Sequence, residues 1–370
     1  MDLYVFDKEL KMVGVVDSFI SLIWVRRSSS SGSFELYVPA TEKYQKLLVS
    51  QRYIMRSDCD EAVYINSVIE KWDEDNGRCI IVSGYSLEGL LSKVRIAEWK
   101  KAALYTPKAA LNAAMERCPV LTANWVNGFP DAEIYQTGML TGTPDGMTVE
   151  QYVRLFYSYW KDWEPIHFSA RIDRAERKIV FEKVQAVDRS KTVIFSADFD
   201  NLKNEMYEYS EEGVVNAVFV KSTLPDSAYT DTASTYNRTF AQMPTYYLDK
   251  SDGANTVEAY VEIEGIFNKG ATVEGVTSYI LDSTQTQYAM EWAAVNAISP
   301  ASENISGEII AEGYRKKFNV GDLVTVKNSV RDITMQRPIE EVTETFDASG
   351  KAVTAVLGVP LKTIYDLIKE

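Results

Sequence analysis

The chain has 370 residues, of which 46% are hydrophobic and 25% charged, and its formal net charge is -14 because 53 Asp and Glu face 39 Lys and Arg. This length and composition indicate a folded protein of about two to four domains. The acidic excess argues against binding of duplex nucleic acid and against docking on anionic membranes, because both require clustered Lys and Arg.

The first part of the chain predicts a β-barrel domain over residues 1–98. Two apolar runs flank the Ser- and Gly-rich turn Ser28–Gly32, and Phe34–Val38 alternates apolar and polar residues with the period of a half-buried strand. Asn76-Gly77, between two further apolar runs, predicts a hairpin with a type I′ turn. Residues 85–93 are predicted to form a short helix whose inward side carries Leu87, Leu90 and Leu91.

Residues 99–190 predict an α+β insert. Thr106-Pro107 is a typical start for a helix at 108–117, and the Gly- and Pro-rich stretch 119–146 indicates an irregular loop. Thr148 and Gln151 form a capping box for a second helix with an aromatic stripe. The spacing of that stripe favours a buried face over a sugar-binding platform. A hairpin is expected at 166–187.

Residues 191–310 predict a second β-barrel domain, with a long connection at 222–254. The alternating stretch 258–265 indicates a strand whose glutamates share one solvated face. Asp282 is predicted to cap a helix near 283–297, whose core face would consist of four apolar residues, Leu281, Tyr288, Trp292 and Val295.

Residues 311–370 predict a C-terminal β region. Strands are expected at 306–312, 318–326, 337–346 and 352–357, with a turn at Asp347–Gly350 and a short helix at 361–368. The fold class predicted for the whole chain is therefore mainly β with α+β insertions.

Residues that would carry chemistry are few. His167 is the only histidine and lies in an alternating stretch, which favours a structural role. The chain lacks a G-x-S-x-G elbow, a Walker A loop and G-x-G-x-x-G. Carboxylate pairs carry no weight among 53 acidic residues. We therefore assign no catalytic, cofactor-binding or metal-binding residues and expect no enzyme activity and no cofactor.

The cellular setting is indicated by the cysteines and the N-terminus. Cys59, Cys79 and Cys118 show no CxxC spacing, which argues against a zinc site or a disulfide framework and suits a cytosolic thiol environment. The N-terminus has no signal-peptide pattern, and no apolar run is long enough for a membrane span. We expect the protein to fold in the cytoplasm.

Several short motifs, in one order along the chain, resemble those of siphovirus tail proteins of Gram-positive hosts, the baseplate hub proteins that also form the N-terminal part of tail-associated lysins. The first is Trp24-x-Arg26-Arg27…Gly32-x-Phe34-Glu35-Leu36-x-x-Pro39. The others are Gly84-Tyr85-x-Leu87-x-Gly89-Leu90-Leu91-Ser92, Phe195-Ser196…Asn201-Leu202, Asn216–Val220 and Val320–Val324. Together these motifs are spread over most of the chain.

The resemblance implies a hub similar to that of contractile phage tails, with two β-barrel domains and two smaller α/β regions in each subunit of a homotrimer. Six barrels in three subunits would match a hexameric ring of the tail tube or distal tail protein, so that the trimer closes the tube and adapts sixfold rings to a threefold tip. Further partners implied are a tape-measure protein and a tip spike or fibre. The protein would then reside in the virion tail tip after assembly in the host cytoplasm, with roles in host attachment and genome ejection.

Candidate subunit-interface residues are Trp24, Arg26, Arg27, Phe34 and Glu35. The three charged residues could form ion pairs between subunits, although solvated charges on an edge strand explain them equally well. Two other functions stay open. A carbohydrate-binding receptor module would fit the 7 Trp and 22 Tyr, and a cell-wall hydrolase would use dispersed carboxylates.

Overall fold

A computed structural model describes residues 1–95, 108, 111–112, 125–129, 148–158, 166–225, 228, 234–236, 242–251, 255–309, 314–328 and 330–358. The chain divides into two compact units. The large unit comprises Met1–Ile134, Pro144–Glu208 and Glu303–Glu370, and the small unit comprises Tyr135–Thr143 and Tyr209–Ser302. The four domain boundaries expected from the sequence remain a prediction.

The large unit is organised around one 13-stranded sheet. Eleven of its strands follow the order β12-β19-β22-β21-β3-β4-β7-β6-β5-β1-β2, and β20 joins β21 to the short strand β11. The strands are β1 (Leu3–Phe6), β2 (Met12–Val16), β3 (Ser21–Arg27), β4 (Ser33–Pro39), β5 (Tyr53–Arg56), β6 (Ala62–Asp73), β7 (Gly77–Ser86), β11 (Ile194–Ser196), β12 (Leu202–Ser210), β19 (Ser302–Ile309), β20 (Leu323–Asn328), β21 (Ile333–Asp347) and β22 (Gly350–Gly358).

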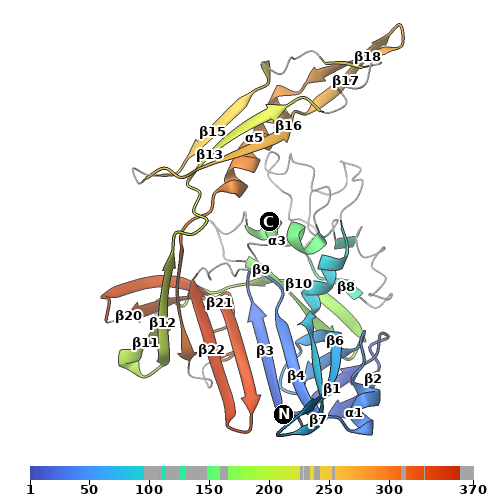
Figure 1. Ribbon diagram of the computed structural model, residues 1–370, viewed down its shortest axis with the longest axis vertical. Helices are drawn as coiled ribbons and strands as arrows, with labels where there is room; N and C mark the ends of the chain where they lie inside the picture. The colour runs from blue at the N-terminus through green and yellow to red at the C-terminus, as the bar shows by residue number, and fades with distance from the viewer. Residues whose placement is uncertain are drawn as a thin grey trace. The chain divides into compact units, whose positions relative to one another are not determined.

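Strand β21 connects the two ends of the chain within this sheet. Its first part pairs with β20, and its second part lies between β22 and β3, with Glu341 opposite Arg27. Figure 1 shows the red strands β21 and β22 beside the blue strands β3 and β4. Strands that the sequence assigned to a first barrel and to a C-terminal region therefore share one sheet.

The mainly β fold with α+β insertions is confirmed, but the two closed barrels are not. Among the described strands, β2 pairs only with β1 and β12 pairs only with β19, so the path of paired strands has two open ends. The period-two pattern predicted strands such as β4 and β16 (Glu258–Glu264) correctly. An alternating pattern does not show whether the first and last strands of a sheet pair to close a barrel, because closure depends on the register between strands far apart in the chain.

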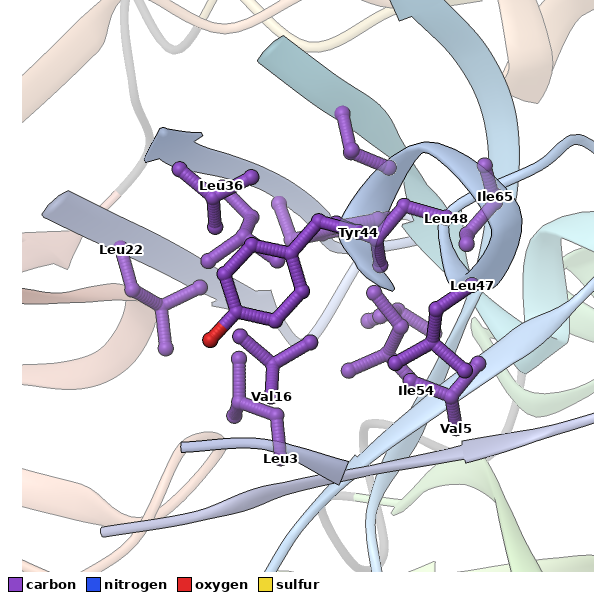
Figure 2. Close-up of a cluster of buried hydrophobic side chains, with 14 of the residues drawn as sticks. Leu3, Val5, Val16, Leu22, Leu36, Tyr44, Leu47, Leu48, Ile54 and Ile65 are labelled. Carbon is purple, nitrogen blue, oxygen red and sulfur yellow. The ribbon is translucent and has the colours of Figure 1, made fainter. Parts of the chain in front are cut away.

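The core beneath the N-terminal strands confirms the predicted alternation. Phe34, Leu36 and Val38 are buried while Glu35 is exposed. Helix α1 (Glu42–Leu47), capped by Thr41, places Tyr44 and Leu47 on this core. Figure 2 shows the Tyr44 ring among aliphatic side chains of the surrounding strands. Its hydroxyl donates to Asp17 Oδ1 at 2.8 Å and accepts from Ser18 N at 3.2 Å.

The β6–β7 hairpin forms as predicted, with a different turn. Gly77 has φ 72°, but Asn76 is not among the described residues with positive φ, so the type I′ turn was wrong. Asp73 Oδ1 instead accepts hydrogen bonds from Asp75 N at 3.2 Å and Asn76 N at 2.9 Å. The carboxylate thus stabilises the three-residue loop 74–76, which is followed by the left-handed Gly77 at the start of β7.

Two glycines of the resemblance motifs lie where the backbone comes closest to a neighbour. A Cβ on Gly32 would collide with the carbonyl oxygen of Val25, beside the β3–β4 turn. A Cβ on Gly84 would collide with the carbonyl oxygen of Tyr64, where the β6–β7 register shifts between Ile65 and Ser67. Both positions therefore require glycine for geometric reasons.

The insert packs beside the N-terminal strands. The 3₁₀ helix η1 (Leu87–Lys93) buries Leu87, Leu90 and Leu91 as expected. Helix α3 (Val149–Ser158) starts with the predicted capping box, in which Thr148 N donates to Gln151 Oε1 and Gln151 N donates to Thr148 Oγ1. Strands β8 (Trp125–Asn127), β10 (Lys178–Gln185) and β9 (Ile166–Asp173) form a three-stranded sheet.

Two expectations for the insert concern residues that are mostly not described. Strand β8 lies in the stretch 119–146, where only a loop was expected. Of the helix predicted at 108–117, residues 108, 111 and 112 are helical, and the rest lies outside the described residues. Trp160 and Trp163 of the aromatic stripe and the terminal helix at 361–368 also lie outside them.

The described residues of the small unit include two three-stranded sheets and the helix α5 (Ser283–Ala297). The first sheet has the order β15 (Thr245–Asp249), β13 (Ala217–Thr223), β16 (Glu258–Glu264), and the second has the order β14 (Ser234–Tyr236), β18 (Val276–Leu281), β17 (Phe267–Val273). Strands β14 and β15 lie inside the stretch expected to be a connection. That expectation was wrong there, because Thr and Tyr are favourable in strands as well as frequent in polar loops.

Helix α5 (Ser283–Ala297) begins at Asp282, whose Oδ1 accepts from Gln285 N at 3.0 Å as predicted. Of the predicted core face, Leu281 is buried and Trp292 half-buried, but the prediction was wrong at Tyr288 and Val295. Thr286, Met290 and Ala294 are buried, whereas Tyr288 and Val295 are exposed. The buried face thus packs Met290 and Ala294 against Val218 and Val220 of β13.

Candidate functional site

The five predicted interface residues lie next to one another at the β3–β4 pair but differ in exposure. Trp24 and Phe34 are buried, with ring centroids 6.2 Å apart. Arg26 and Arg27 are half-buried, and Glu35 is exposed. The interface role of these residues remains a prediction, and in the single chain only Glu35 of the five presents an exposed side chain.

Arg26 belongs to a group of internal ion pairs that we call the charge seam, consisting of Arg26, Arg56, Glu61, Arg315 and Glu344. Arg56 and Glu344 have side chains 0% and 1% exposed, and Arg56 Nη1 lies 2.6 Å from Glu344 Oε2. Arg315 contacts Glu344 at 2.7 Å and Glu61 at 3.0 Å. Arg26 Nη2 lies 2.6 Å from Glu61 Oε1. The seam thus joins β3, β5 and Glu61, the residue before β6, to Arg315 and to Glu344 of β21.

Aromatic rings enclose the seam. The Arg56 guanidinium carbon lies 5.6 Å from the ring centroid of Trp24 and 5.0 Å from that of Phe346. Arg26 donates a hydrogen bond of 2.7 Å to the Tyr314 hydroxyl. Cations over ring faces gain electrostatic energy when water is excluded. Trp24 of the first resemblance motif therefore has an internal role beside a buried arginine.

The carboxylates of the seam are held in the ionised form. Burial alone would raise the pKa of Glu344, but the hydrogen bonds from Arg56 and the charge of Arg315 outweigh it and lower the pKa to about 2. Burial likewise opposes ionisation of Glu61, while the charges of Arg26 and Arg315 keep the pKa of Glu61 below its usual value. The seam is therefore a network of charged groups, and neither of its carboxyl groups is held in the protonated form that a general acid needs.

Asp322 of the motif Val320-Gly321-Asp322 forms hydrogen bonds within the chain. Asp322 Oδ2 accepts hydrogen bonds from Asn319 N at 2.9 Å and Arg189 Nε at 2.8 Å, and Asp322 Oδ1 accepts from Val187 N at 2.9 Å. One buried carboxylate thus fixes its own turn and fastens residues 187–189 to it. Asn201 acts similarly, because its side chain accepts from Ser196 N and donates to Ile194 O.

The turn Ser28–Gly32 is fastened to neighbouring segments. Glu340 accepts from Ser28 Oγ at 2.6 Å and from Ser29 N at 2.9 Å. Glu150 of α3 accepts from Ser31 N at 3.1 Å, and Arg154 donates to Ser28 O at 3.2 Å. The serines therefore serve turn geometry, as the sequence indicated, and the turn links β21 and α3.

A cavity of about 40 Å³ lies next to this turn, lined among others by Arg26, Gly32, Glu61, Glu88 and Arg154. Glu88 Oε1 accepts from Ala170 N at 2.7 Å, whereas Glu88 Oε2 is buried without a protein partner. The volume suits water rather than a sugar residue. The pKa of Glu61 is lowered by the charges of Arg26 and Arg315, whereas the general acid of a glycoside hydrolase has a raised pKa.

Other chemistry is sparse in the part of the chain that the structure describes. No group of three or more His, Cys, Asp and Glu residues there could hold a metal ion. Cys59 and Cys79 are unpaired thiols, and Cys118 lies outside the described residues. The backbone of His167 lies on β9 opposite Val184. None of the described helices is both long and apolar enough to cross a membrane.

Sequence reasoning missed the exposed aromatic side chains. Trp72, near the end of β6, is 76% exposed. In the small unit, Phe219, Tyr247 and Tyr260 are 37%, 46% and 57% exposed. The available signal was their position among charged neighbours, since Tyr260 lies between glutamates two residues away on either side. Exposed aromatic residues are frequent binding hot spots, which makes these positions candidates for partner contacts.

Comparison with known proteins gives a family and a fold. Residues 2–359 match the model of the siphovirus ReqiPepy6 Gp37-like protein family. The structure is similar to the 43 kDa tail protein of prophage MuSo2 from Shewanella oneidensis, with a TM-score of 0.59, 13% identity, and coverage of 96% of this chain and 98% of the other. It is also similar to the tail protein from Neisseria meningitidis MC58, with a TM-score of 0.56, 10% identity, and coverage of 96% and 95%. No curated protein sequence matches the chain.

Proposed function

The chain belongs to the siphovirus ReqiPepy6 Gp37-like protein family, and from this premise we propose that it is a structural subunit of a phage tail tip, the hub of the baseplate, without catalytic activity. The observation that carries the proposal is the family match over residues 2–359, which is nearly the whole chain. The resemblance inferred from short motifs agrees with this match. The fold shared with two solved tail proteins supports the same role.

The proposed assembly is a homotrimer in the virion. It seats on a hexameric ring of the distal tail protein or tail tube, closes the tube and adapts sixfold rings to a threefold tip. A tape-measure protein and a tip spike or fibre are the proposed further partners, and assembly takes place in the host cytoplasm.

The charge seam suits such a role. A hub subunit contacts several neighbouring subunits at once. In this proposal, a fixed pairing of β3 with β21 keeps its contact surfaces in place before those neighbours bind. Internal ion pairs favour one register over alternatives, because a shifted strand would separate buried charges from their partners. The exposed residues Trp72 and Ile69 on β6, at 76% and 53%, offer apolar contact area for a ring subunit.

The test places a peptide tag in a turn and images the particles. Gly275, in the β17–β18 turn, has φ 83°, and a Cβ added there would meet no atom within 4 Å, so an insertion at this turn leaves both strands intact. Gold-labelled antibody should mark the tip of purified particles. A tag that never enters a particle, in cells where the untagged tail proteins assemble, contradicts the proposal.

The trimer is tested by the copy number in the same particles. Quantitative mass spectrometry of isolated tips should find three copies for each sixfold ring, as the adapter role requires. Six copies would retain the tail location and overturn the symmetry adaptation. The mass of the isolated subunit is not informative here, because hub subunits are able to stay monomeric until they meet a ring.

A further inference from the structure

The small unit carries a row of aromatic side chains on the outer face of its first sheet, which we call the aromatic row: Tyr247, Phe219 and Tyr260. These residues come from β15, β13 and β16 and lie directly opposite one another in the strand register. The rings of Phe219 and Tyr260 stack with centroids 5.8 Å apart and planes inclined by 11°. The row therefore crosses the full width of the sheet.

The fold of the small unit does not account for this row. The other face of the sheet packs on α5, where Val218 and Val220 contact Met290 and Ala294. All four of these residues are buried, whereas the aromatic row is 37% to 57% exposed. A single exposed aromatic residue is ordinary on a protein surface, but three adjacent ones form a contiguous apolar area. The row is thus available to a partner.

Carboxylates surround the row. Tyr247 donates its hydroxyl to Glu258 Oε1 at 2.8 Å, and Tyr260 donates to Glu262 Oε1 at 2.6 Å. Asp249 and Glu264 are also exposed on this face, which includes one cation, Lys221. An ionised carboxylate accepts about four hydrogen bonds, so one tyrosine hydroxyl leaves acceptor capacity at Glu258 and at Glu262. The carboxylates that orient the two tyrosines are therefore the same groups that would accept hydrogen bonds from a ligand.

We propose that the aromatic row binds an arginine-bearing segment of a partner protein. A guanidinium stacks on an aromatic ring and at the same time donates paired hydrogen bonds to a carboxylate, and the row offers both kinds of group side by side. The negative charge of the face argues against two other occupants. A second copy would bring like charges together, and an anionic polymer would be repelled.

This inference goes beyond the proposed hub function, since it concerns the small unit and requires no trimer. It is tested on the isolated full-length protein. The probe is a short peptide that alternates Arg and Gly, compared by calorimetry with peptides in which Lys or Glu replaces Arg. The Arg peptide should bind saturably and lose affinity as salt is raised, the Lys peptide should bind more weakly, and the Glu peptide should not bind.

The decisive variant replaces all three aromatics, Phe219→Ser, Tyr247→Ser and Tyr260→Ser. It should weaken the Arg peptide by about tenfold or more. The matched control is Tyr209→Ser, because Tyr209 is 54% exposed and also donates to a nearby glutamate, Glu211, at 2.8 Å. The control should bind like the parent. A second variant, Glu258→Gln with Glu262→Gln, keeps the rings and should flatten the salt dependence.

Three results would overturn the inference. One is a triple variant that binds the Arg peptide as the parent does. Another is a Lys peptide that binds as well as the Arg peptide, which leaves charge alone as the cause. The third is binding of a neutral glycan on an array that the triple variant abolishes, which would make the row a carbohydrate platform. Because purified protein is used, failure here is separate from failure to enter a tail.

Discussion

The two units use the same residue types in opposite places. In the large unit, Arg56 lies between Trp24 and Phe346 in the interior, and its charge is matched by Glu344. In the small unit, Phe219 and Tyr260 stack on the outside, beside exposed glutamates. The difference teaches that period-two alternation marks two faces of a strand without saying which face a neighbouring element will cover.

The largest expected effect comes from breaking the interior network. Glu344→Ala should lower the free energy of unfolding of the large unit by about 3–5 kcal/mol, because it removes the buried carboxylate that Arg56 and Arg315 share and leaves Arg56 with Asp58, whose side chain is 46% exposed. The measurement is chemical denaturation combined with hydrogen exchange resolved by peptide. Protection should fall in β3 and β21 and stay unchanged in β13 and β16.

The control lies on the same strand. Glu341 pairs with Arg27 at 2.6 Å, but both side chains are about a third exposed, at 27% and 33%. Glu341→Ala should therefore cost only about 0–1 kcal/mol. Equal losses for the two variants would contradict the distinction between an interior seam and a surface pair. Loss of protection in both units would show that they unfold together.

Acid should weaken the large unit next. The pKa of Glu344 is about 2 in the folded protein, against 4.5 as its ordinary value. Since the folded pKa is the lower one, the ionised form contributes stability above about pH 4.5, and this contribution is lost as the pH falls toward about 2. The shift corresponds to about 3 kcal/mol. Unfolding free energies across this range should show the loss, and Glu344→Gln should flatten the curve.

A smaller effect is expected at the turn that links β21 and α3. Ser28→Ala removes the hydrogen bond from Ser28 Oγ to Glu340, and should destabilise the large unit by about 1 kcal/mol. Denaturation curves measure this. Ser30→Ala is the comparison on the same turn and should change stability by less, because the hydrogen bonds that fasten this turn come from Ser28, Ser29 and Ser31.

The smallest effect is expected at the aromatic row. Phe219→Ser, Tyr247→Ser and Tyr260→Ser should each change the stability of the small unit by only about 0.5 kcal/mol, since these side chains lie outside its core. Val220→Ala, on the buried face of the same strand, should cost clearly more, because it opens space against α5. If Phe219→Ser matched Val220→Ala, the row would be part of the fold.

Local features of the fold were predictable from the sequence. Capping residues such as Thr148 and Asp282, the glycine of the β6–β7 hairpin, and the alternation of Phe34 to Val38 all act over a few residues, and each element lies where it was predicted. Some local rules nevertheless failed. Helix α5 buries Thr286, Met290 and Ala294 and exposes Tyr288 and Val295, because the face that meets the sheet is set by packing that helical periodicity alone does not reveal.

The candidate site was less predictable, because its contacts join residues far apart in the chain. Arg26 and Arg27 were predicted to be interface residues because they are charged and lie in a β-rich segment. In the structure, however, Arg26 forms an ion pair with Glu61 and a hydrogen bond with Tyr314. No spacing rule relates these three positions. The pairing of Glu341 with Arg27 across β21 and β3 has the same character. Such partners are specified only by the complete topology.

The place of β21 has a consequence for synthesis of the protein. As the nascent chain leaves the ribosome, β3 finds β4 at once, but its second edge has to wait for β21. The small unit, whose main segment Tyr209–Ser302 is made in between, is complete before that edge is covered. An unpaired strand edge can pair with other chains. The pairing of β3 with β21 forms slowly, because the two strands are far apart in the sequence. A chain cut short before β21 would therefore expose the β3 edge and be prone to aggregate.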